Sequence, residues 1–204
     1  MKTTTEIDPQ LVKKLREKTN AGMMDCKRAL VEASGDFAKA EAILRTKGIA
    51  SASKKASRAT KEGIVASYIH QQGKVGVLVE VNCETDFVAK NENFRAFVKD
   101  ITLHIAAAHP LYVSRADVPS NLIEAEREIY RAQAKGKPEN VAEKIVDGKL
   151  DKFFSTVCLL EQGFIKNPDQ TIGDLVKAKI TELGENIIIR RFTRYLMGEP
   201  LLES

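Results

Sequence analysis

The 204-residue sequence is long enough for one domain, or two small ones, with a buried core. With 43% hydrophobic residues, 29% charged residues and a net charge of +4, it has the composition of a soluble globular protein. No apolar run approaches the ~20 residues of a membrane-spanning helix, and the N-terminus lacks the hydrophobic core of a secretion signal. We therefore expect a cytoplasmic protein with no membrane partner.

The cysteines support this expectation. Cys26, Cys83 and Cys158 are odd in number and far apart in the sequence. This pattern indicates buried or free thiols in a reducing compartment and argues against a disulfide framework or a metal site. No metal and no cofactor are expected.

Residues 1–48 are predicted to form a small domain of three short helices joined by tight turns. Asp8 and Pro9 are typical of a helix start, an N-cap acid followed by a proline in the first turn. Asp36 can cap the third helix, and Gly48 is expected to end it. The predicted order is a frayed start at 1–7, a helix over 8–19, a turn at 20–22, and helices over 24–33 and 36–48.

Two methionines stand at the start of the second predicted helix. Neighbours on a helix point about 100° apart, so Met23 and Met24 do not share one buried face. In one interpretation one methionine is buried and the other is incidentally exposed. In the other, both form an adaptable apolar contact for a partner.

Residues 49–62 are expected to be a basic linker. The run 46–61 carries five positive charges and no negative ones, and it is rich in alanine and serine. We interpret it as a solvated hinge, partly helical, with an RNA- or ribosome-binding strip as the alternative. No aromatic residue is interleaved with these charges, which argues against base stacking, and no direct nucleic-acid binding is expected.

Residues 63–204 are predicted to form a core domain that combines strands and helices. Valines alternate with other residues along 75–82, which is typical of a strand with one buried face. The fold class is therefore α+β: the N-terminal helices and linker, then a three-stranded antiparallel sheet with packed helices. The expected strands are 63–70, 75–82 and 187–196, with a hairpin turn at 71–74; the expected helices are 92–108, 120–134, 138–158 (interrupted at 147–148) and 171–183, with a less regular loop at 161–170.

The most informative stretch follows the valine strand. Thr85 and Asp86 are both good N-cap residues, and Phe87 falls in the first turn of whatever follows. In the simpler interpretation, Asp86 caps a helix and Phe87 packs beneath it. In the functional interpretation, the acid and the ring are presented together to a partner, because aromatic anchors at rigid sites are typical binding hot spots.

No catalytic pattern is present. The sequence has no phosphate loop, GxGxxG, paired CxxC or HExxH motif, and its Ser, Cys and His residues form no recognisable nucleophile arrangement. Asp100 and His104, four residues apart on a predicted helix, are expected to be a capped, solvated pair. These absences favour a binding protein over an enzyme.

Three stretches together carry a family resemblance: LREKTNAGMMDCKRAL at 15–30, EVNCETDFVAK at 80–90, and Gly184–Ile187 followed by Arg190 and Arg191. They resemble the signatures of bacterial translation elongation factor Ts, in its short form, in the right order and over nearly the whole chain. The resemblance implies that residues 1–48 are of the ubiquitin-associated type. It also implies a guanine nucleotide exchange factor for the GTPase elongation factor Tu, which binds the GDP form and promotes GDP release so that GTP can bind.

The resemblance also implies roles for particular residues. Thr85, Asp86, Phe87 and Val88 match the corner that intrudes beside the Mg²⁺ and phosphate site of elongation factor Tu. The matching contact positions for docking are Lys13, Arg16, Met23 and Met24.

The short form of the family implies a homodimer, with the sheets at the interface and two partner molecules in a 2:2 complex. Two other classes stay open from the residues alone: a general protein-interaction module built on the N-terminal helices, and an RNA-binding accessory factor using the linker.

Overall fold

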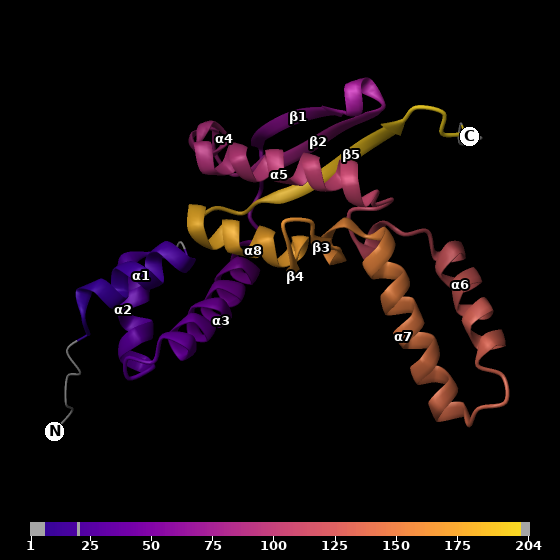
Figure 1. The fold of residues 1–204 in the computed structure, drawn as a ribbon, viewed down its shortest axis with the longest axis horizontal. Coiled ribbons are helices and arrows are strands. Elements are labelled where there is room, and N and C mark those ends of the chain that lie inside the picture. The colour runs from indigo at the N-terminus through magenta and orange to yellow at the C-terminus, as the bar shows by residue number, and fades with distance from the viewer. Residues whose placement is uncertain (1–6, 20, 201–204) are drawn as a thin grey trace. The chain divides into compact units, whose positions relative to one another are not determined.

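The computed structural model describes residues 7–19 and 21–200. The expected frayed start, apart from Ile7, and Asn20 of the expected turn lie outside them. In chain order the elements, with η marking 3-10 turns, are α1 (Pro9–Thr19), α2 (Met23–Glu32), α3 (Phe37–Lys55), β1 (Glu62–His70), η1 (Gln71–Gly73), β2 (Val75–Cys83), α4 (Asp86–Lys90), α5 (Glu92–Ala108), η2 (Arg115–Asp117), α6 (Ser120–Gln133), α7 (Glu139–Val157), η3 (Leu159–Glu161), β3 (Gly163–Phe164), β4 (Asn167–Thr171), α8 (Ile172–Leu183) and β5 (Ile188–Leu196) (Figure 1).

The chain divides into two compact units. The first consists of the described part of Met1–Gly63 with Asn82–Phe94 and Val176–Ile188. The second consists of Ile64–Val81, Arg95–Leu175 and the described part of Ile189–Ser204. The mixed α and β class is confirmed, whereas the division at residues 48 and 62 stays a prediction.

The three N-terminal helices of the first unit have a core of their own. Leu15, Cys26 and Leu30 are fully buried in it, together with Ala40 of α3. The predicted caps are present: Asp8 accepts a hydrogen bond from the amide of Gln10 (2.8 Å), and Asp36 accepts one from Lys39 (3.0 Å). The prediction of three helices at the N-terminus is therefore confirmed.

The third helix is longer than predicted. α3 continues through Gly48 to Lys55, so the first half of the expected linker is helical. Glycine costs a helix only about 1 kcal/mol relative to alanine. At Gly48 the absence of a side chain lets α8 approach α3 closely. A Cβ on Gly48 would lie 3.1 Å from the hydroxyl oxygen of Thr181, which itself donates to the Gly48 carbonyl (3.2 Å). Packing between α3 and α8 therefore overrides the break that glycine suggested.

The sheet has the strand order β1-β2-β5, as predicted (Figure 1). All four valines of β2 at 75, 77, 79 and 81 are buried. The apolar residues of α5 that recur with the helical period are buried as well, namely Phe94, Phe97, Val98, Ile101 and Ile105. The C-terminal end of α5 is bonded to β5, because Arg194 donates from Nε to the carbonyl of Ala106 (3.4 Å). The turn between β1 and β2 is tight, with Gln72 in the left-handed region at φ 57°.

Helices α6 and α7 form a hairpin in the second unit and run side by side in Figure 1. Val146, Leu150 and Phe154 of α7 are buried between the two helices and the segment that precedes α6. The predicted interruption at Asp147–Gly148 is wrong, since α7 is continuous over 19 residues. Buried residues on either side of Gly148 hold the helix together against the small cost of that glycine.

The segment expected to be a less regular loop contains a short ladder. β3 and β4 pair antiparallel, with Gly163 opposite Thr171. A Cβ on Gly163 would lie 2.8 Å from the carbonyl oxygen of Pro168, so only glycine fits this close approach.

The prediction that His104 forms a solvated pair with Asp100 is wrong. The imidazole is fully buried: its Nδ1 accepts from the amide of Ile165 (3.3 Å), so Nε2 carries the proton and donates to Oε1 of Gln162 (3.0 Å). Asp100 instead pairs with Lys166 (2.7 Å). Burial lowers the pKa of His104 below its ordinary value, because a charged ring loses its hydration there.

This histidine predicts a pH dependence of stability. In the unfolded chain His104 takes up a proton near pH ~6.5, whereas the folded state binds it only at lower pH. The free energy of unfolding should therefore be at its full value above pH ~6.5 and fall as the pH drops toward the pKa of the folded state. Urea unfolding at about pH 7.5 and about pH 5.5 measures this fall, which should be smaller in His104→Gln. Equal falls in the two proteins would contradict the assignment.

Candidate functional site

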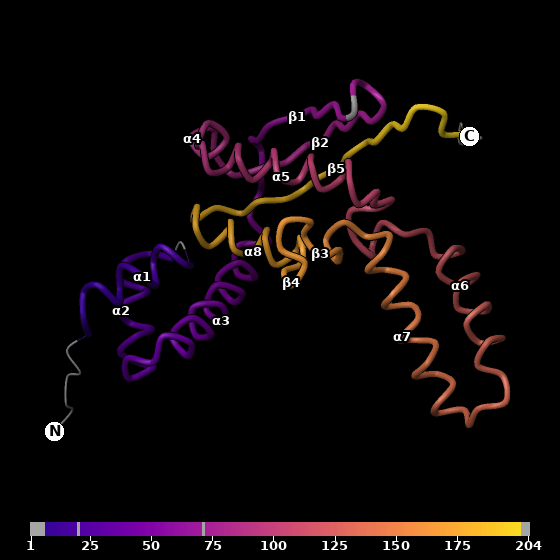
Figure 2. Tube along the Cα trace, viewed as in Figure 1, coloured from indigo at the N-terminus to yellow at the C-terminus, as the bar shows by residue number. Residues whose placement is uncertain are grey.

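The four residues of the predicted corner lie between the end of β2 and the first turn of α4, where the trace in Figure 2 turns sharply. Thr85 is the N-cap of α4, with its hydroxyl accepting from the amide of Val88 (3.4 Å). Asp86 therefore does not cap the helix. It is the first residue of α4, where a negative charge is favoured by the helix dipole.

Phe87 points away from the protein. Its side chain is 81% exposed, the highest value among the exposed large hydrophobic residues of the described chain. Ala89, two residues later, provides the buried contact of this short helix. The interpretation that Phe87 packs beneath the helix is therefore wrong, and the ring is free to contact another molecule.

Asp86 is charged and already has a partner. Its carboxylate lies 2.6 Å from Nζ of Lys90, one turn later on the same helix. The hydrogen bond from Lys90 lowers the pKa of Asp86 below its ordinary value. An exposed ion pair of this kind costs little to open, so the carboxylate is available to an incoming group.

The corner is held by Glu185, a residue for which the sequence suggests no role of its own. Both oxygens of the Glu185 carboxylate accept hydrogen bonds: Oε2 from the amides of Glu84 (3.1 Å) and Thr85 (3.0 Å), and Oε1 from the hydroxyl of Thr85 (2.6 Å). No local sequence pattern could reveal these bonds, because the partners are about 100 residues apart along the chain. The sequence signal that includes Glu185 is the family stretch that begins at Gly184.

The thiol of Cys83 belongs to the same neighbourhood. It donates to the carbonyl of Thr85 (3.2 Å). Burial, with a smaller contribution from the negative charge of Glu185, raises the pKa of Cys83 to about 11. The thiol is therefore neutral and serves as a hydrogen-bond donor that helps to fix the backbone before α4.

The four predicted docking residues lie on the N-terminal helices. Lys13 and Arg16 are exposed on α1 and three residues apart, so they lie on one face of the helix. Met23 is 47% exposed and Met24 62% exposed at the start of α2. The interpretation that buries one of the two methionines is therefore wrong.

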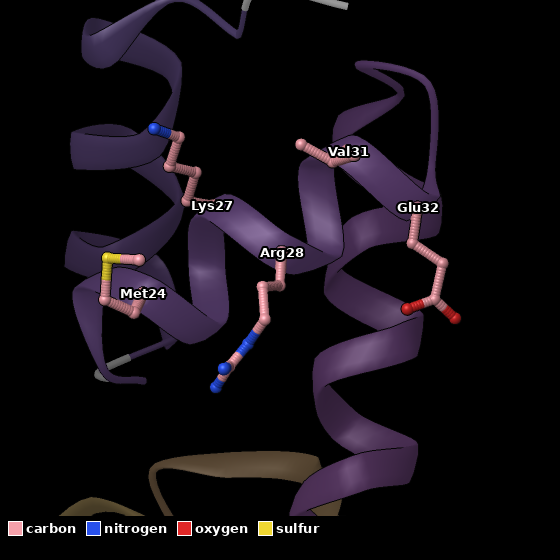
Figure 3. Close-up of a pocket in the computed structure, with 5 residues that line it drawn as sticks. All are labelled: Met24, Lys27, Arg28, Val31 and Glu32. Atoms are coloured by element: carbon pink, nitrogen blue, oxygen red, sulfur yellow. The ribbon is translucent and has the colours of Figure 1, made fainter. Parts of the chain in front are cut away.

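The surface of α2 continues this apolar patch. A shallow hollow of about 310 Å³ is lined by Met24, Lys27, Arg28, Val31 and Glu32, all from α2 (Figure 3). Methionine and valine supply its apolar part, and the charged residues flank it. A flexible methionine at such a place can adapt to the shape of a partner.

Metal sites, disulfides and membrane-spanning helices were each sought among the residues that the structure describes. Within 7–19 and 21–200, no cluster of His, Cys, Asp and Glu could hold a metal ion, and the three cysteines are buried and free. Among the helices of this part of the chain, none is both long and apolar enough to cross a membrane.

Comparison with known proteins is consistent with these features. The family model described as Elongation factor TS matches residues 49–199. Elongation factor Ts of Carboxydothermus hydrogenoformans is 62% identical over 200 residues, which cover 97% of this chain and 92% of the relative. Elongation factor Ts of Geobacter sp. (strain M21) is 61% identical (95% of this chain, 90% of the relative), and that of Acetivibrio thermocellus is 57% identical (96% and 92%). The chain therefore belongs to the elongation factor Ts family and is a translation elongation factor.

Proposed function

We propose that this protein is a guanine nucleotide exchange factor for elongation factor Tu. The observation that carries the proposal is the exposed ring of Phe87 on a capped corner, in a chain that belongs to the elongation factor Ts family. The protein binds the GDP form of its partner, disturbs the Mg²⁺ and phosphate site, and so promotes GDP release. This work requires no covalent chemistry, and we propose that the protein is not an enzyme.

The mechanism follows from what holds a nucleotide in such a GTPase. Backbone amides, a lysine and a Mg²⁺ ion bind the phosphates, and Mg²⁺ requires near-octahedral geometry. A small displacement of its ligands therefore weakens nucleotide binding greatly. Phe87 acts as the wedge, Asp86 makes polar contacts to the displaced segment, and Thr85 and Val88 flank them.

The free energy for this intrusion must come from binding elsewhere. If the protein weakens GDP binding by some factor, GDP weakens binding of the protein by the same factor, so tight docking is needed to drive GDP out. Lys13, Arg16, Met23 and Met24 supply that docking on the helices of residues 1–48. Their exposure on α1 and α2 supports this assignment.

The basic linker, residues 49–62, is proposed as a connector between this docking domain and the core of residues 63–204. Part of its charge is neutralised within the protein, because Arg58 pairs with Glu84 (3.5 Å). This supports the proposal that it makes no direct contact with nucleic acid. The exchange role places the protein in the cytoplasm with its partner.

The sheet offers a surface for a second copy of this chain. Val65, Ile69 and Leu78 are exposed on the face opposite the buried valines. A Cβ on Gly76 would lie 3.4 Å from Cδ1 of Ile69, so these two positions are on the same face of the sheet. Side chains two or four residues apart in a strand share a face, which adds Leu78 from β2 and Val65 from β1. An exposed apolar sheet face supports a homodimer through the sheets, which would bind two partner molecules.

The wedge is tested by release of fluorescent GDP from elongation factor Tu. Wild-type protein should accelerate release, and Phe87→Ala should reduce the accelerated rate about tenfold or more, as expected for a hot-spot aromatic residue. The mutant should keep its unfolding free energy, since the ring has few contacts. Ile129→Ala, which shortens an exposed side chain on α6, is the control and should act as wild type. No acceleration by wild type would discard the exchange function.

The docking assignment is tested by binding. Met23→Asp places a charge in the apolar contact and should weaken affinity for elongation factor Tu about tenfold or more. Val141→Asp, a matching change at an exposed position of α7, should leave affinity unchanged. Titration calorimetry compares the two, and an unchanged affinity for Met23→Asp would show the docking assignment to be wrong.

The dimer is tested by light scattering. Wild-type protein should have the mass of two chains of 22.6 kDa. Leu78→Glu should shift the mass to one chain, because the charge would be buried without a partner at the interface. Ile129→Glu serves as the control and should remain dimeric. A single-chain mass for wild type at working concentration would rule the dimer out.

A further inference from the structure

We infer that Glu185 and Asn186 are positioning residues for exchange: they join the corner that carries Phe87 to the end of the helix that carries the docking domain. This inference rests on the proposed exchange function and adds a part to it. Three segments of the first unit meet at these residues, namely 56–58, 84–85 and 185–186. We call the hydrogen bonds between them the corner knot.

Glu185 fixes the backbone of the corner. One carboxylate accepts from two consecutive amides, those of Glu84 and Thr85, and from the Thr85 hydroxyl. The same hydroxyl accepts from the amide of Val88 as the N-cap of α4. Glu185 therefore orients the capping side chain itself, so the start of α4 depends on a residue from the other end of the chain.

Asn186 completes a reciprocal exchange of bonds. Its backbone amide donates to Oε1 of the Glu84 side chain (2.6 Å), while the backbone amide of Glu84 donates to the side chain of the neighbouring Glu185. Two backbone segments are thus bonded through each other's side chains. Such charge-assisted bonds are roughly twice as strong as neutral ones.

Asn186 also reaches the end of α3. Its side chain, 2% exposed, donates from Nδ2 to the carbonyls of Arg58 (2.9 Å) and Ala56 (3.3 Å). Ala56 is the C-cap of α3, so the bond to its carbonyl satisfies an acceptor that the helix leaves unpaired, and the bond to Arg58 holds the segment just after the helix. The guanidinium of Arg58 returns to Glu84 and closes the knot.

The consequence is a mechanical connection. Helix α3 packs with α1 and α2, which carry the docking residues, and it runs without a break to the knot. The proposed hinge between docking domain and core is therefore tied at its end to the corner. Docking on the N-terminal helices can then press Phe87 into the partner, rather than moving a loose segment.

Rigidity matters at this corner because α4 has only five residues and an isolated helix of that length is unstable in water. A mobile corner would have to be ordered when it binds, and the conformational entropy lost in that ordering would oppose the intrusion of Phe87. The knot makes that ordering part of folding. Its loss should therefore affect the step in which Phe87 intrudes more than the docking step.

The test separates these two steps. GDP release is measured over a range of concentrations of this protein for wild type and for Glu185→Gln, which keeps the shape but replaces an accepting oxygen with an amide. The maximal release rate should fall about tenfold, whereas the concentration for half-maximal effect should change less than about twofold. Amide hydrogen exchange at Glu84 and Thr85 should become faster in the same variant.

Two further variants keep the test decisive. Glu182→Gln, which loses an ion pair with Lys179 (2.7 Å) and touches no part of the knot, should behave as wild type in both measurements. Asn186→Asp, which faces two carbonyls with a carboxylate, should lower the maximal rate as Glu185→Gln does. Thermal unfolding of each variant shows that it is folded, and Glu185→Gln alone carries the test if Asn186→Asp does not fold.

The outcomes distinguish the two proposals. If wild type accelerates release and Glu185→Gln matches it, the positioning role is wrong and the exchange function stands. A Glu185→Gln variant that raises the half-maximal concentration without lowering the maximal rate also overturns the role, because the residue would then serve docking. Failure of wild type to accelerate release would overturn the exchange function, and the positioning role with it.

Discussion

A single carboxylate, that of Glu185, satisfies the donors at the point where the sheet ends and a helix begins. The ladder of β2 stops at Cys83, and the helix of α4 cannot yet bond its own first amides. Glu185 accepts from the amides of Glu84 and Thr85, which lie in this gap. Phe87 has little packing of its own, so the direction of its ring depends on how firmly the backbone before it is held.

The protein combines a rigid part with an adaptable one. The corner is fixed by hydrogen bonds to polar groups that are themselves partly buried. It is therefore rigid enough to displace a segment of a partner, as the proposed exchange function requires. The methionines of α2 are flexible and exposed, and they suit a contact that must fit before any displacement occurs. α3, with 19 residues and a length of about 28 Å, packs against α2 and gives the methionine surface a stiff support.

Much of the fold could be predicted from local patterns. The valines of β2 are recognisable because burial follows the two-residue period of a strand. Gly48 and Gly148 suggest helix breaks, but both helices continue because the cost of a glycine is small enough for packing to outweigh it. The partner of His104, Gln162, is 58 residues away, and the contacts of Glu185 span about 100 residues, so neither could be found locally. The residues alone leave Phe87 open between a packed ring and a presented one, and its exposed side chain decides for the second.

The buried cysteines give each region an internal reporter. Cys26 lies in the core of the N-terminal helices, Cys83 beneath the corner and Cys158 at the end of α7. Burial raises the pKa of Cys83 and of Cys158 to about 11, so both thiols stay protonated. A buried, protonated thiol reacts with an alkylating reagent only when its surroundings open. The labelling rates of the three cysteines, measured separately, would therefore report how often the N-terminal helices, the corner and the C-terminal end of α7 open to solvent.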